Sequence, residues 1–172
     1  MFELLFFIFL LLILLFIVIS TLLIGIAPTP SSKKVALKFQ TLIATSSYET
    51  IIDLGSGFGT LAIFLARKFP DRKIIGYEIS FFPWLFSLLL KYVFNLKNLE
   101  LYQKDFLKLP FENALYICYL FPKGMEKINE KINQEDSHIE LISSTFALRN
   151  KKVKKEVKVN DIYQTPLLWY RT

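Results

Sequence analysis

The chain has 172 residues, of which 53% are hydrophobic, and its formal net charge is +6. This length allows one ordinary domain, and the hydrophobic content is high for a water-soluble one. Because the chain has a single cysteine, Cys118, and a single histidine, a disulfide framework is excluded and no metal site is expected.

The excess of hydrophobic residues lies at the N-terminus. Residues 4–26 are 23 consecutive uncharged positions, which as a helix would cover the roughly 30 Å hydrocarbon core of a bilayer. A cleaved signal peptide is the alternative, because Gly25 and Ala27 have the spacing of a cleavage site. However, no Lys or Arg precedes the run, the run is too long for a signal peptide, and Pro28 would hinder cleavage. We therefore predict that residues 1–27 form a transmembrane anchor that stays attached.

The charges flanking this run predict its orientation. Glu3 is the only charged side chain before it, whereas Lys33, Lys34 and Lys38 follow shortly after. Because positive charge is retained on the cytoplasmic side, we expect a single-pass protein whose following domain lies on the cytoplasmic face of a membrane. That domain carries a net charge of about +7, which favours an anionic lipid surface and does not require nucleic acid.

The remaining chain alternates between strand and helix patterns. A hinge over residues 28–32 leads into a helix at 33–46, with Ser31 or Ser32 as its N-cap. Strands are then predicted at 50–55, 73–78, 99–105, 114–120, 139–148, 151–161 and 165–172, and helices at 60–69, 81–95 and 123–132.

This alternation predicts an α/β domain over residues 33–172, with a doubly wound, mostly parallel, seven-stranded sheet. The last two strands are too close together for a crossover helix, so we expect a C-terminal antiparallel hairpin at or near one edge. Ligands of such sheets bind beyond the carboxyl ends of the strands.

The predicted helix at 81–95 is unusual because it has one charge, Lys91, and no polar face. Such a helix either packs under another element or contacts a bilayer. Burial within the fold is the favoured interpretation. Lipid contact through Phe82, Trp84 or Phe86 is the alternative.

Three glycines, Gly55, Gly57 and Gly59, follow the first predicted strand and precede a helix. Such a turn lets a ligand approach the backbone, and a nucleotide is the usual occupant. The dinucleotide fingerprint would need a glycine where Thr60 stands, and Asp53 would repel its pyrophosphate. A carboxylate before the turn instead favours a cationic ligand such as S-adenosylmethionine, which carries an ammonium and a sulfonium.

Two further acids end the next two strands. Glu78 stands 19 residues after Gly59, where its oxygens could accept both ribose hydroxyls. Asp105 could accept a hydrogen bond from the adenine amino group while Phe106 covers the ring. Each acid alone is more simply a turn former, a strand end or a cap. Three acids at three successive strand ends favour a nucleotide-type cofactor.

The segments "IIDLGSGFG", "IIGYE" and "KDF" resemble the first three motifs of class I S-adenosylmethionine-dependent methyltransferases, which have a Rossmann-like sheet. The likeness extends over about residues 33–172. It implies that the chain is an enzyme with S-adenosylmethionine as cofactor. The predicted cofactor-binding residues are Asp53, Gly55, Ser56, Gly57, Gly59, Glu78, Asp105 and Phe106.

A narrower likeness lies in "PTPSSKKVALKF", "GYEISFFPWL" and "YLFPKGMEKINEKI". These segments are similar to those of small membrane-anchored methyltransferases related to the mitochondrial enzymes that trimethylate lysine on ATP synthase subunit c and on the adenine nucleotide translocase. The resemblance implies an N-terminal anchor and, as methyl acceptor, a lysine of an integral membrane protein.

The chain departs from many amine-methylating enzymes of class I, which have an Asn/Asp-Pro-Pro-Tyr motif after the fourth strand. It has Leu120, Phe121 and Pro122 there. Methyl transfer mainly requires alignment of a neutral nucleophile, so no metal is needed. We hypothesise that the Leu120 carbonyl accepts a hydrogen bond from the acceptor amine and that Phe121 lines the channel through which the acceptor enters. Pro122 would supply no competing N–H donor. An equally good interpretation is a plain strand end.

Other functions stay open at this stage. A lipid or quinone acceptor would require a deep apolar pocket near residues 28–30 and Phe121. A non-catalytic, methyltransferase-like assembly factor is compatible with intact cofactor acids. Nucleic-acid methylation is disfavoured because the lysines are dispersed along the chain.

Overall fold

The computed structural model describes residues 2–11, 32–135 and 137–172. Residues 2–11 are helical and exposed. The greater part of the predicted anchor and hinge lies outside the described residues. Among the helices that are described, none has both the length and the apolar character needed to cross a bilayer.

The domain alternates helices and strands as the sequence predicts. The helices are α2 (Lys33–Ala44), α3 (Thr60–Lys68), α4 (Phe81–Val93) and α5 (Pro122–Gln134), and a short 3-10 helix, η1, spans Phe106–Lys108. The strands are β1 (Thr50–Leu54), β2 (Lys73–Glu78), β3 (Leu99–Gln103), β4 (Leu115–Cys118), β5 (Glu140–Ser144), β6 (Val153–Lys158) and β7 (Pro166–Arg171). Each predicted strand is present, and most are shorter than predicted.

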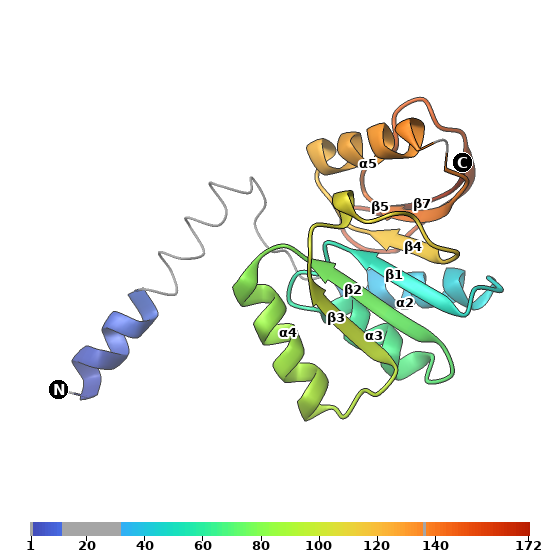
Figure 1. Cartoon of the computed structure of the whole chain (residues 1–172). Helices are drawn as coiled ribbons and strands as arrows, with labels where there is room; N and C mark the ends of the chain where they lie inside the picture. The colour runs from blue at the N-terminus through green and yellow to red at the C-terminus, as the bar shows by residue number, and fades with distance from the viewer. Residues whose placement is uncertain (1, 12–31, 136) are drawn as a thin grey trace.

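One seven-stranded sheet has the order β3-β2-β1-β4-β5-β7-β6 (Figure 1). The pairs among β1 to β5 are parallel, whereas β7 is antiparallel to both β5 and β6. This arrangement confirms the predicted sheet and its antiparallel hairpin, which ends the sheet at β6. The carboxyl ends of the five parallel strands meet at one edge, called here the carboxyl edge.

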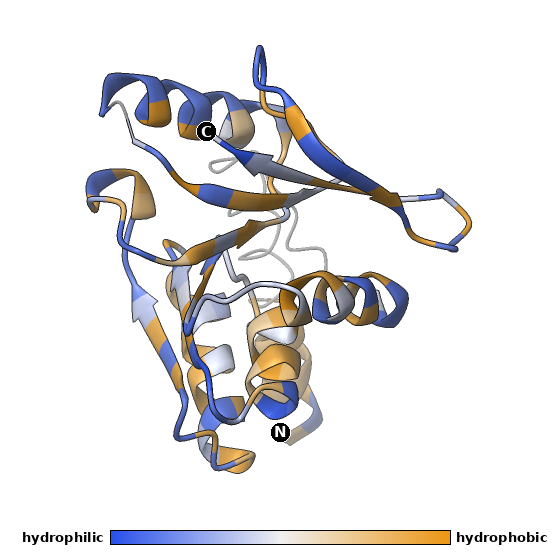
Figure 2. Cartoon of the chain, turned by 90° about the vertical axis from the view of Figure 1, so that its right-hand side faces the viewer, coloured by the Kyte–Doolittle hydropathy of each residue, from blue (hydrophilic) through white to orange (hydrophobic). Residues whose placement is uncertain are grey.

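Helices cover both faces of the sheet. The core on one face contains residues from α2 and α3 with Trp84 and Leu90 of α4 packed against it, and the core on the other contains Met125, Ile128 and Ile132 of α5. Hydrophobic and hydrophilic residues alternate around α5 (Figure 2). Cys118 is buried in the second core, and this burial raises the pKa of its thiol.

The start of α2 agrees with one of the two predicted caps. The Ser32 hydroxyl accepts a hydrogen bond from the Val35 amide at 3.3 Å, so Ser32 is the N-cap. Val35, Phe39 and Ile43 recur at spacings of four and are buried. The helix therefore packs its apolar stripe onto the domain directly after the predicted hinge.

The favoured interpretation of α4, burial within the fold, is wrong. Its inner side buries Pro83 and Ser87, and Trp84 donates a hydrogen bond from Nε1 to the Leu101 carbonyl at 3.1 Å. Its other side is exposed, with Leu89 58% and Tyr92 70% accessible. Sequence hydropathy predicts a helix without a polar face but does not reveal whether other elements cover both sides.

A buried carboxylate joins the three strands at the antiparallel end of the sheet. Glu140 on β5 accepts hydrogen bonds from Trp169 Nε1 at 2.9 Å, from Arg171 Nε at 2.6 Å and from Lys154 Nζ at 3.2 Å. Burial raises the pKa of Glu140, but these donors, Arg171 foremost, lower it, and the balance lies below the ordinary value. Glu140 is thus ionised and paired at neutral pH.

We expect the substitution Glu140→Gln to lower the free energy of unfolding by about 1–3 kcal/mol at pH 7, because it weakens the charge-assisted hydrogen bonds of a buried carboxylate. Since the folded-state pKa is depressed, the difference from the unsubstituted chain should shrink as the pH falls below about 4.5. Urea unfolding of the full chain in detergent measures it. The surface pair of Glu100 and Lys73 provides the control, because Glu100→Gln should change stability by less than about 0.5 kcal/mol. Equal effects of both substitutions would contradict a structural role for Glu140.

Candidate active site

The glycine turn lies between β1 and α3 at the carboxyl edge. Gly55, Gly57 and Gly59 all have positive φ, at 77°, 55° and 73°. A Cβ at Gly55 would meet Leu120 Cδ2 at 2.7 Å, and one at Gly59 would meet Ser87 Cβ at 2.7 Å. A Cβ at Gly57 would meet nothing within 4 Å. The turn is therefore packed at both ends and open at its middle, where a ligand can approach the backbone.

Glu78 at the end of β2 holds this turn. One carboxylate oxygen accepts a hydrogen bond from the Gly57 amide at 2.8 Å, and the other accepts one from the Ser80 amide at 2.7 Å. A carboxylate has about four acceptor positions, so the predicted bonds to ribose hydroxyls remain possible beside these two. The structural role of Glu78 was not predicted from the sequence.

Asp53 lies on β1 just before the turn and is buried. No described residue donates a hydrogen bond to its carboxylate. Burial, together with the nearby charge of Glu78, raises the pKa of Asp53 to about 7. A buried carboxylate without a donor is costly, and a cationic ligand would relieve that cost.

The Ser56 side chain lies beneath the turn. Its amide donates to the Tyr77 carbonyl at 2.9 Å, and its buried hydroxyl has no hydrogen-bond partner among the described residues. That hydroxyl lies close to Gly76 on β2. The predicted cofactor role of Ser56 stays a prediction.

Asp105 and Phe106 follow β3 at the same edge. Asp105 caps η1, since its Oδ1 accepts a hydrogen bond from the Leu107 amide at 3.0 Å. Phe106 is partly buried and packs against the core beneath α5. The capping interpretation of Asp105 is thus correct, and Oδ2 has no bond to a described residue, so the predicted adenine contact remains a prediction.

Leu120, Phe121 and Pro122 connect β4 to α5. The Leu120 side chain is buried against Gly55 and Gly124, so it joins this connection to the glycine turn. Phe121 is the N-cap of α5 and Pro122 its first residue. No described residue donates a hydrogen bond to the Leu120 carbonyl.

An aromatic pair that was not predicted stands at this connection. The Phe121 ring stacks on Phe146, with centroids 6.1 Å apart and planes at 27°. Phe146 follows Thr145, which has a φ of 71°, and the Phe146 carbonyl accepts a hydrogen bond from Ser143 Oγ at 2.8 Å. A threonine in this conformation is strained, and such strain is concentrated at functional sites. No glycine or asparagine marks the turn, so the sequence gives no local signal for it.

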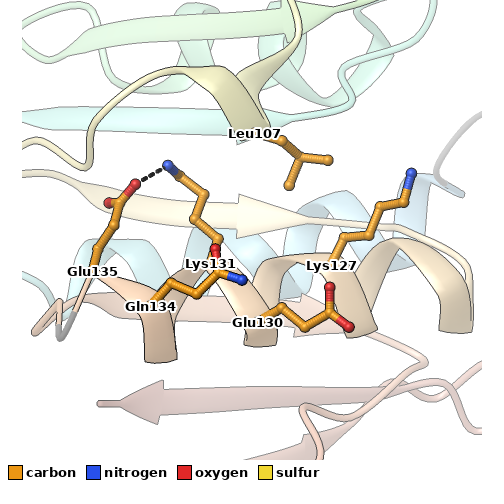
Figure 3. Close-up of a pocket in the computed structure, with 6 residues that line it drawn as sticks. All are labelled: Leu107, Lys127, Glu130, Lys131, Gln134 and Glu135. Atoms are coloured by element: carbon orange, nitrogen blue, oxygen red, sulfur yellow. Dashed lines mark hydrogen bonds and ion pairs between the residues drawn. The ribbon is translucent and has the colours of Figure 1, made fainter.

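A surface hollow of about 310 Å³ lies elsewhere, between η1 and the C-terminal half of α5 (Figure 3). It is lined by Leu107, Lys127, Glu130, Lys131, Gln134 and Glu135. Lys131 and Glu135 form an ion pair across its floor. The lining is almost wholly polar, whereas ligand pockets are mainly apolar, so the hollow is not part of the candidate active site.

The described residues contain no group of His, Cys, Asp and Glu side chains that could hold a metal ion. The three predicted acids lie instead at the carboxyl edge, and Glu78 bonds the glycine turn directly. Asp53, Glu78 and Asp105 come from the ends of three neighbouring parallel strands. The geometry thus brings together the three acids that the sequence assigned to one site.

Residues 53–155, more than half of the chain, match the family described as the ANTKMT methyltransferase domain. The chain belongs to this family. The match contains the glycine turn, the three acids and the β4–α5 connection, and it begins after the predicted anchor. No curated protein matches the chain.

Solved structures with the same fold include an RNA methyltransferase from Salinibacter ruber in complex with S-adenosyl-L-homocysteine. It has a TM-score of 0.70 and 20% identity, over 83% of this chain and 93% of that one. A SAM-dependent methyltransferase from Aquifex aeolicus has a TM-score of 0.63 and 14% identity, over 84% and 94%. Magnesium protoporphyrin IX methyltransferase from Synechocystis PCC 6803 with bound SAM has a TM-score of 0.62 and 15% identity, over 79% and 77%. At these identities the likeness establishes the fold.

The predicted methyltransferase and its cofactor, S-adenosylmethionine, are therefore confirmed. The residues present fit this cofactor. Asp53 offers a buried negative charge to its cationic end, Gly57 leaves the backbone open, and Glu78 and Asp105 each retain acceptor capacity. The site thus combines charge and space in the arrangement that the cofactor requires.

We expect the affinity for S-adenosylhomocysteine to increase severalfold between pH 6.0 and 7.5. With its pKa near 7, Asp53 is mostly protonated at the lower pH and mostly ionised at the higher one, and only the ionised form attracts the ammonium. Calorimetric titration of the full chain in detergent measures the change. Asp53→Asn keeps the shape and should both weaken binding and remove this pH dependence. A pH dependence that survives in Asp53→Asn would assign the titration to another group.

Proposed function

We propose that the chain is a membrane-anchored methyltransferase that N-methylates a lysine side chain of an integral membrane protein. The observation that carries this proposal is the aromatic pair of Phe121 and Phe146, directly after Leu120, whose side chain packs against Gly55 of the glycine turn. An aromatic wall accommodates the alkyl chain of a lysine and interacts favourably with its methylated ammonium. The membership in the ANTKMT methyltransferase domain family agrees with it.

The chain's own residues would perform three tasks. Asp53 and the glycine turn hold the cofactor, which when bound supplies a methyl carbon on a sulfonium. The aromatic wall of Phe121 and Phe146 packs against the alkyl chain of an entering lysine and positions its amine. The Leu120 carbonyl then accepts a hydrogen bond from the neutral amine and aligns its lone pair. Transfer of that methyl group to the amine would release a neutral thioether, and the Leu120 carbonyl would hold the amine N–H until its proton leaves to water.

The membrane part of the proposal rests on the sequence. Residues 4–26 are uncharged over a length that spans a bilayer, and lysines follow them. We infer that this segment anchors the chain as a single pass and that the domain lies on the cytoplasmic face. An acceptor in the same membrane is then confined near the active site. The proposal includes neither nucleic acid nor a metal as partner.

The test is transfer of a labelled methyl group from S-adenosylmethionine to membranes of the parent organism, with the full chain in liposomes. We expect the label in protein, and acid hydrolysis should release it as methyllysine. Asp53→Asn should abolish at least about 90% of this transfer, because cofactor binding is lost. Label in the organic phase would instead indicate a lipid or quinone acceptor, and label released by ribonuclease an RNA acceptor. No transfer despite cofactor binding would favour a non-catalytic assembly role.

Phe121→Ala and Phe146→Ala should each lower turnover about tenfold to 100-fold, because the acceptor amine loses alignment. The dissociation constant of S-adenosylmethionine should stay within about twofold, since neither ring holds the cofactor. Steady-state kinetics and calorimetry separate the two effects. Phe111→Ala, which removes a different aromatic pair, the edge-to-face contact with Tyr116, is the control and should leave turnover near normal. Parallel losses of turnover and cofactor affinity would contradict an acceptor wall.

A further inference from the structure

The outer side of α4 carries a continuous set of exposed apolar side chains, called here the α4 outer face. Its members are Phe81, Leu85, Phe86, Leu89, Tyr92 and Val93, each 43–70% exposed. Their spacing places them within one arc of the helix, and Lys91, the only charged residue of α4, lies outside that arc. Contiguous apolar surfaces of this kind mark sites of interaction with a membrane or a protein.

The orientation of α4 is fixed by its inner side. Ser87 and Pro83 are buried, and the Trp84 indole donates to the Leu101 carbonyl on β3. The elements α3, β2 and β3 pack against this inner side (Figure 1). The helix cannot turn its outer face inward without breaking these contacts.

Basic residues surround one end of the α4 outer face. Arg67 places its guanidinium 5.2 Å from the centroid of the Phe94 ring, and Lys91 lies 5.9 Å from that of Tyr92. Lys68 and Lys97 are exposed nearby in the sequence. An apolar helix face with Lys or Arg at its border is typical of helices that lie in the interface of an anionic bilayer.

The sequence restricts how far this face can be from a bilayer. The apolar run ends at residue 26, and α2 begins at Lys33. The six residues between them span at most about 22 Å when fully extended. Because α2, α3 and α4 form neighbouring helices on one face of the sheet, the short connection holds this helical layer beside the membrane.

We propose that the α4 outer face inserts into the interfacial region of an anionic bilayer and thereby orients the domain. The proposal rests on the membrane attachment included in the proposed function. It adds a second contact, which restrains a domain that a single point of attachment would leave free to rotate. Among possible occupants, lipid is favoured because the face is uncharged, is bordered by cations and belongs to the helical layer whose first helix, α2, follows the apolar run.

Contact between the α4 outer face and lipid would also affect the position of the active site. Phe86 of the outer face meets Phe58 of the glycine turn edge to face, with centroids 5.7 Å apart. Ser87, the next residue, lies directly beneath Gly59. The N-terminal end of α4 also follows Glu78 within three residues. Docking of α4 therefore sets the position of the cofactor turn relative to the lipid surface.

The test uses the full chain in liposomes of phosphatidylcholine and phosphatidylglycerol, with an environment-sensitive fluorophore on one introduced cysteine. Leu89→Cys reports the outer face, Lys127→Cys on α5 reports the opposite face of the sheet, and Leu15→Cys reports the apolar run. Cys118 is buried, so the unsubstituted chain is the labelling blank. Spin-labelled acyl chains in the liposomes should quench the label at position 89 at least twofold more than the label at position 127.

The three positions separate the possible failures. Quenching at position 15 but not at position 89 would overturn α4 docking while leaving the anchor intact. Quenching at neither position 15 nor position 89 would overturn both the anchor and the docking of α4. An emission shift at position 89 without quenching by lipid would show that protein covers the face, from a second copy or from this chain's N-terminal segment, and would also overturn the proposal. Replacing phosphatidylglycerol with phosphatidylcholine should reduce quenching at position 89, because the basic border loses its attraction.

Discussion

The active site depends on the two hydrogen bonds that the Glu78 carboxylate accepts from backbone amides. The carboxylate binds the amides of Gly57 and Ser80 with one oxygen each, and so ties the glycine turn after β1 to the start of α4. The positive φ of Gly57 has no side-chain packing to maintain it, since the space where a Cβ would stand is open. The carboxylate therefore replaces packing contacts and keeps the turn both open and ordered.

The same pair of acids sets the electrostatics of the site. Glu78 is satisfied by two amides, whereas buried Asp53 has no described donor and its pKa is raised to about 7. The domain therefore gives one carboxylate two backbone donors and leaves its neighbour without a described donor. Two acids at adjacent strand ends differ because their surroundings differ, which their spacing in the sequence does not reveal.

Much of the fold could be predicted because it follows from periodicity. Alternating strands and helices fix a parallel sheet, and the short connection between the last two strands fixes an antiparallel hairpin. The acids of the site could be found because each ends a strand. Phe146 could not, because its position depends on the strained backbone of Thr145 and on stacking with Phe121, which lies 25 residues earlier in the chain. Contacts of this range leave no periodic signal.

The α4 helix shows a different limit of sequence reasoning. Its composition indicates burial, yet the domain covers only the side that carries Pro83, Trp84 and Ser87. A helix that is apolar all round is stable only if something covers its remaining side. Residues 4–26 form an uncharged run of bilayer length. This run and the α4 outer face are thus two apolar surfaces that both have to be kept from water. A lipid bilayer can cover both surfaces, and the basic residues at the border of α4 then lie near anionic headgroups.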